Sequence, residues 1–65
     1  MDERMLKWFA WTHLPEKLQP ISMPFGDLAE AICRNIPPGP ERTVALRKLL
    51  ESKDAAVRAA LHPGG

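Results

Sequence analysis

The sequence has little cysteine, little histidine, no tyrosine and no long hydrophobic run. Its 65 residues include one cysteine, Cys33, so a disulfide within the chain is excluded. With only His13 and His62 beside that cysteine, a closed Cys/His zinc site is nearly excluded. The short apolar runs predict no membrane span. Acidic residues stand ahead of the first apolar run, which predicts no secretory leader and a cytosolic location.

The chain also lacks an excess of charge of either sign. Nine basic and eight acidic residues give a net charge of +1, so no strong attraction to nucleic acid or anionic membranes is expected. The hydrophobic share of 45% is that of an ordinary globular protein. A domain of this size hides only about 60% of its unfolded surface. Because disulfides and zinc are set aside, self-association is the remaining expected support.

Residues 1–14 of this single predicted domain, 1–65, are expected to form a short aromatic arm. The arm contains three of the four aromatic residues: Trp8, Phe9 and Trp11. Its apolar spacing allows one or two helical turns, and Asp2 and Glu3 would suit the first of them. Trp8 and Phe9 are expected to cap the hydrophobic core.

Residues 15–35 are predicted to form the first helix. Its apolar residues recur at steps of three and four: Leu18, Ile21, Phe25, Leu28, Ile32 and Ile36. Pro20 and Pro24 each remove a backbone donor, so we expect a bent or loosened start and a regular helix from Phe25 to about Arg34. Cys33 is expected to be an inert core thiol. Residues 36–40, IPPGP, predict a stiff turn.

Residues 41–61 are predicted to form the second helix, because they are rich in good helix formers and contain no glycine or proline. Lys53 interrupts their apolar stripe, which comprises Leu46, Leu49, Leu50, Val57, Ala60 and Leu61. Two helices joined by a short turn must lie antiparallel. The predicted fold class is therefore all-α: an arm or short helix followed by an antiparallel hairpin, which buries its remaining apolar surface in a homo-oligomer.

No pattern of catalytic or cofactor-binding residues is found. His13 has no nucleophile motif near it, and there is no glycine-rich phosphate loop. Asp27 and Glu30 are one helical turn apart and are interpreted as surface charges. The sequence therefore predicts no enzyme, no cofactor and no metal. A small DNA-binding regulator and a structural or adaptor hairpin without a small ligand remain alternatives, although the second helix has a net charge of only +2 and DNA is not expected.

The end of the arm combines an aromatic ring with nearby basic residues. Trp11 is followed by His13 and Lys17. An aromatic face stacks on a nucleobase, and a cation meets a phosphate, so this combination suits a ligand with both groups.

The order of these segments resembles a known family. WFAWTHLPEKLQPISMPFGDLAEAI followed by IPPGPERTVALRKLLESKDAAVRAAL is similar to the helical-hairpin domain of phage anti-CBASS cyclic-oligonucleotide sponges, which some Thoeris inhibitors share. The resemblance covers about residues 8–61. It implies a non-enzymatic oligomer built from dimers, typically a hexamer, with pockets between subunits. Such proteins sequester cyclic di- or trinucleotides in the cytoplasm of the infected bacterium and so block antiphage signalling.

The resemblance also implies ligand-binding residues. Trp11 matches the arm aromatic, often a tyrosine, and keeps the stacking face without the phenol hydroxyl. His13 matches the arm histidine and is expected to fix the arm through hydrogen bonds. Lys17 is the nearest candidate for a phosphate-binding lysine. Arg42 and Thr43 are further candidates, because they stand at the start of the second helix, where the helix N-terminus favours anions. Arg47 and Lys48 are also candidates, with surface salt bridges as the alternative interpretation.

Overall fold

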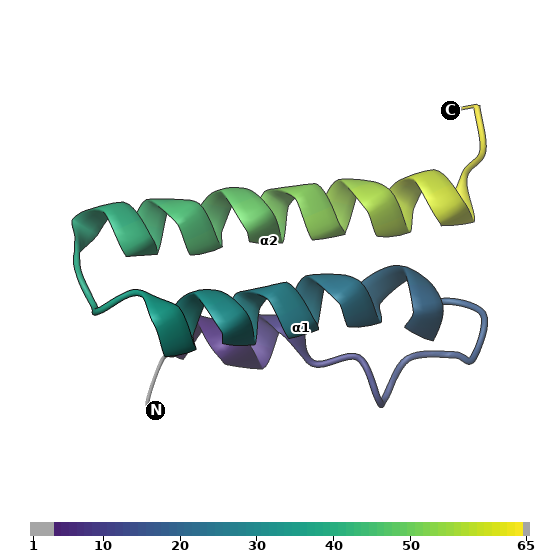
Figure 1. Cartoon of the computed structure of the whole chain (residues 1–65). Helices are drawn as coiled ribbons and strands as arrows, with labels where there is room; N and C mark the ends of the chain where they lie inside the picture. The colour runs from purple at the N-terminus through teal and green to yellow at the C-terminus, as the bar shows by residue number, and fades with distance from the viewer. Residues whose placement is uncertain (1–3, 65) are drawn as a thin grey trace.

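Two antiparallel α-helices lie side by side in the computed structural model, which describes residues 4–64 (Figure 1). A short 3-10 helix, η1, spans Arg4–Phe9, α1 spans Gln19–Asn35 and α2 spans Pro40–Leu61. Residues 4–64 contain no strand, and η1 contacts both α-helices. The prediction of an all-α hairpin after a short N-terminal helix is confirmed. Asp2 and Glu3, expected in the first turn of the arm, lie outside the described residues.

The first helix begins later than the predicted residue 15 and is regular earlier than expected. α1 starts at Gln19 and continues through Pro24 as one helix. Pro20 lies in the first turn, where a backbone N–H has no partner within the helix. Pro24 removes a single hydrogen bond near the same end, so its effect is confined to the start of the helix.

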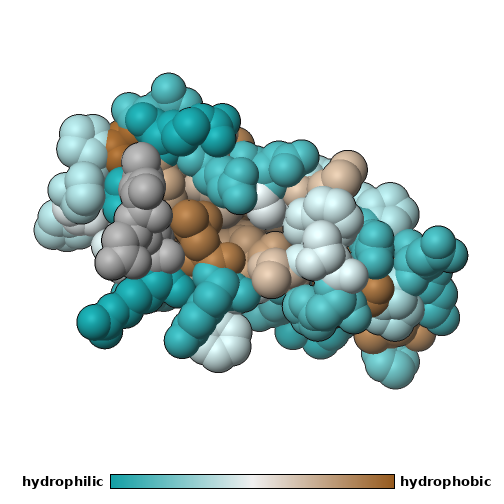
Figure 2. All heavy atoms as spheres, turned by 90° about the horizontal axis from the view of Figure 1, so that it is seen from below, coloured by the Kyte–Doolittle hydropathy of each residue, from teal (hydrophilic) through white to brown (hydrophobic). Residues whose placement is uncertain are grey.

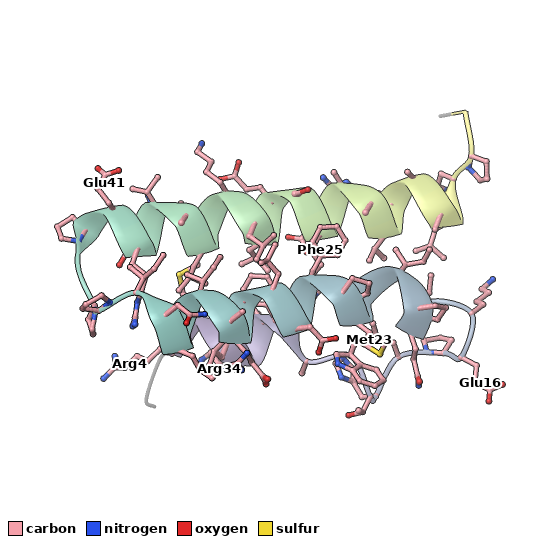
Figure 3. The ribbon with its side chains drawn as sticks, viewed as in Figure 1. Arg4, Glu16, Met23, Phe25, Arg34 and Glu41 are labelled. Carbon is pink, nitrogen blue, oxygen red and sulfur yellow. The ribbon has the colours of Figure 1, made fainter. Side chains whose placement is uncertain are left out.

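Small residues form the buried face of α1. The four buried positions are spaced by four, three and four residues: Ser22, Gly26, Ala29 and Cys33. Of the larger apolar residues, Phe25 and Ile32 pack against the core and are partly buried. Leu28, and Ile36 just after the helix, are 51% and 45% exposed. Phe25 points toward α2 (Figure 3). Small side chains let η1 approach α1, and Cys33 is a buried free thiol as expected.

Apolar packing and a hydrogen bond between distant residues hold η1 on the hairpin. Phe9 is buried in a core cluster with Ala29, Cys33 and Leu46. The Lys53 ammonium, which interrupts the apolar stripe of α2, donates a hydrogen bond to the Trp8 carbonyl at 2.6 Å. Phe9 therefore caps the core as predicted. The prediction was wrong for Trp8, whose side chain is 58% exposed and does not belong to the core cluster. The Lys7 ammonium lies over its ring, 5.1 Å from the ring centroid.

Replacing Lys53 with methionine is expected to lower the free energy of unfolding by about 1 kcal/mol, because the Trp8 carbonyl loses a charged donor. Urea unfolding followed by circular dichroism measures this change. Lys48→Met is the matched control, because Lys48 lies on the same helix and makes only an exposed ion pair with Glu51. Equal stability of the two variants would show that the contact to Trp8 does not stabilise η1.

Candidate functional site

An open hollow lies where the arm turns into α1. Its volume is about 690 Å³, and its lining comes from the arm, the turn after it and the first two turns of α1: Trp11, Glu16, Lys17, Gln19, Pro20 and Met23. In Figure 3, Glu16 marks this end of the molecule, and Met23 points from α1 toward the arm rather than toward α2. Of the residues predicted from sequence to bind a ligand, Trp11 and Lys17 line this hollow together.

Local hydrogen bonds hold the segment that carries Trp11. The Leu14 N–H donates to the Trp11 carbonyl at 3.0 Å, which closes a tight turn. The amide of Gln19, at the start of α1, donates to the carbonyls of Leu14 at 2.9 Å and Thr12 at 3.3 Å. The side chain of Gln19 therefore ties the arm to α1 and fixes the backbone beside Trp11.

The chemistry of the hollow is that of an aromatic and thioether surface beside a cation. Trp11 is half-buried, whereas Lys17 and Met23 are exposed. The indole face can stack on a flat ring, and a thioether makes favourable contacts with aromatic groups. The Lys17 ammonium can meet a phosphate, while the neighbouring Glu16 carboxylate lowers the net charge. The geometry suits a flat, anionic ligand.

A second hollow lies on the other side of Trp11. It has a volume of about 230 Å³ and is lined by residues of η1, the arm and α1: Leu6, Phe9, Ala10, Trp11, Thr12, Gly26, Asp27 and Glu30. Two carboxylates and no basic side chain contribute to it. The carboxylates repel a phosphate there, whereas the first hollow combines the Trp11 ring with the Lys17 ammonium and is the candidate site for a ligand with a base and a phosphate.

His13 does not line either hollow beside Trp11. Its side chain is exposed on the turn between η1 and α1. The side-chain hydrogen bonds to the backbone of this turn are donated by Gln19, which was not among the residues predicted from the sequence. No local sequence pattern indicates this role of Gln19, because the role depends on where the carbonyls of Leu14 and Thr12, five and seven residues earlier, lie in the folded chain.

Arg42 lies at the turn between the helices and does not line the hollow that contains Lys17. Its side chain is buried, and Nη1 donates to the carbonyls of Ile36 at 2.9 Å and Cys33 at 3.4 Å. These carbonyls belong to the end of α1, which offers partial negative charge and unsatisfied acceptors. Arg42 therefore holds the two helices together at the turn, where it also lines, together with Arg34, a separate hollow of about 240 Å³.

The remaining candidates of α2 do not join the hollow. Thr43 Oγ1 donates to the Gly39 carbonyl at 3.2 Å, and Lys48 makes an exposed ion pair with Glu51 at 3.8 Å. Arg47 is exposed on the same helix. In Figure 3, Glu41 at the start of α2 and Glu16 at the hollow mark opposite ends of the hairpin. A single chain therefore cannot place these groups around one small ligand.

Neither α-helix of the described residues is long and apolar enough to cross a membrane. Within residues 4–64, no group of three or more His, Cys, Asp or Glu side chains could hold a metal ion. No known family, curated protein or solved structure matches the chain. The candidate site is therefore defined by its own geometry alone.

Proposed function

We propose that this protein sequesters cyclic oligonucleotide second messengers, without cleaving them, in the cytoplasm of an infected bacterium. By keeping the messenger from its effector, it would inhibit antiphage signalling of the CBASS type. The observation that carries the proposal is the placement of Trp11 and Lys17 in one open hollow. These two side chains supply what a nucleobase and its phosphate require.

A homo-oligomer is part of this proposal. The buried apolar core of the described residues is small: Phe9, Leu18, Ala29, Cys33 and Leu46. Larger apolar side chains, including Met23 and Leu28, remain exposed, and Figure 2 shows apolar surface at the centre of one face between hydrophilic flanks. A second copy would cover such surface. A two-fold dimer would also present Trp11 and Lys17 twice, matching the two bases and two phosphates of a cyclic dinucleotide. The sponge resemblance implies dimers arranged as a hexamer.

Calorimetric titration of the protein with cyclic di- and trinucleotides, followed by heat release and chromatography of the ligand, tests this function. Saturable binding with intact ligand recovered would support sequestration. Recovery of linear products would show hydrolysis instead, and no binding to any ring would reject the proposal.

The exposed apolar side chains also favour a second candidate function. A structural or adaptor hairpin would use them to associate with itself and would have no small ligand. Trp11→Ala distinguishes the two functions. The adaptor predicts a change in the assembly measured by sedimentation without any nucleotide binding to the parent protein. The sponge predicts a loss of nucleotide binding.

Lys17→Gln is expected to weaken binding of a cyclic dinucleotide by about threefold to tenfold, because one charged contact to a phosphate is lost. Binding by the variant should also depend less on salt between low and physiological ionic strength. Lys48→Gln is the matched control, since Lys48 is an exposed lysine of α2 that does not line the hollow. Equal losses in the two variants would indicate a general charge effect and would remove Lys17 from the site.

A further inference from the structure

We infer that Gly26 is a positioning residue for Trp11: the missing side chain at this position lets the arm lie directly on α1 and sets the place of the indole. Gly26 is buried in the middle of α1 and lines the second hollow together with Trp11. Trp11 lines the candidate site, so the expected effect of Gly26 on ligand affinity rests on the proposed function.

Two parts of the arm meet Gly26. A Cβ atom placed on Gly26 would lie 3.1 Å from the Phe9 carbonyl oxygen and 3.3 Å from Cδ1 of Trp11, with Nε1 of the same ring at 3.7 Å. The first two separations are tighter than ordinary van der Waals contact, and the closest atom belongs to the backbone. A side chain at position 26 therefore requires the Phe9 carbonyl and the Trp11 ring to move by a few tenths of an ångström.

Helix stability alone does not explain this glycine. Glycine is among the weakest helix formers, and alanine at an unconstrained interior position would stabilise α1. The structure gives the glycine a packing role instead, because the segment from Phe9 to Trp11 crosses the helix at this point. Gln19 holds the arm beyond the crossing, so a displacement at Gly26 is not free to spread along the arm and must move the ring.

The test compares Gly26→Ala with Gly39→Ala in a Trp8→Phe background, which leaves Trp11 as the only tryptophan. Gly39 is the matched control, because its backbone is extended and a Cβ there would meet nothing within 4 Å. We expect Gly26→Ala to increase quenching of Trp11 fluorescence by acrylamide and to shift its emission to longer wavelength. Gly39→Ala should leave both unchanged, and circular dichroism should show a folded hairpin in both variants.

The second measurement is titration with the cyclic dinucleotide that the parent protein binds best. Gly26→Ala is expected to weaken binding by about tenfold through a misplaced stacking surface. In a Trp11→Ala background, the same change should cause no further loss, because its effect passes through the ring. Additive losses would assign Gly26 a role separate from Trp11 and overturn the inference.

The two measurements separate the two proposals. Unchanged fluorescence in Gly26→Ala overturns the positioning role, whatever the ligand result. Changed fluorescence in a protein that binds no cyclic nucleotide supports the positioning role and rejects the proposed function. Changed fluorescence with unchanged affinity shows that the ring does not contact the ligand, which overturns the link between Gly26 and binding.

Discussion

Replacing Trp11 with alanine is expected to weaken binding of a cyclic dinucleotide by at least about tenfold, because each lost base–aromatic stack removes roughly 1–3 kcal/mol. In a dimer, the substitution would remove both stacks at once. The hairpin should remain folded, since the buried core cluster of Phe9, Ala29, Cys33 and Leu46 does not include Trp11. Calorimetry measures the affinity, and circular dichroism measures the fold.

Trp8→Ala is the matched control for this experiment. It is the only other tryptophan, it is 58% exposed, and it does not line the hollow. Its contact with α2 uses the backbone carbonyl, which the substitution retains. If Trp8→Ala lowers affinity as much as Trp11→Ala, the ligand is bound elsewhere and the hollow is not the site.

Leu46→Ala is expected to lower the free energy of unfolding by roughly 2–5 kcal/mol, as truncation of a buried leucine does in other small proteins. Leu46 is 0% exposed and contributes to the core cluster between the helices. A chain of 65 residues has a total stability of only about 3–10 kcal/mol. The thermal unfolding midpoint of the variant should therefore lie well below that of the parent protein.

Leu61→Ala is the same substitution on the same helix at a position that is 45% exposed. Its thermal unfolding, followed by circular dichroism, should remain close to that of the parent protein. Similar midpoints for the two leucine variants would mean that the interface between the helices contributes little to folding.

The second helix was largely predictable from the sequence because its signals are local. The prolines and glycine before it and the proline and glycine after it enclose a run of good helix formers, and the structure places α2 at Pro40–Leu61. The buried face of α1 was harder to predict. Hydrophobic spacing emphasised the large side chains, but packing against η1 and α2 selected small ones. The amino-acid sequence of α1 does not indicate how closely η1 and α2 pack against it.

The candidate site was predictable from the sequence in its local part only. Trp11 and Lys17 are close in sequence, so their proximity in the hollow follows from a short turn. The role of Arg42 depends on carbonyls six and nine residues earlier, across the turn between the helices. Its charge and its place at a helix start therefore suggested an anion site, whereas the structure uses the same charge to cap α1.

The contact between Lys53 and Trp8 affects the order in which the parts of the molecule fold. It joins residues 45 positions apart, whereas α1 and α2 are neighbours along the chain. As the protein emerges from a ribosome, the arm is made first, yet this anchor becomes available only after most of α2 has followed. Long-range closure of this kind carries an entropic cost that the hairpin itself does not have. The position of η1 on the hairpin is thus expected to be fixed last, and amides of η1 should exchange with solvent faster than those of the paired helices.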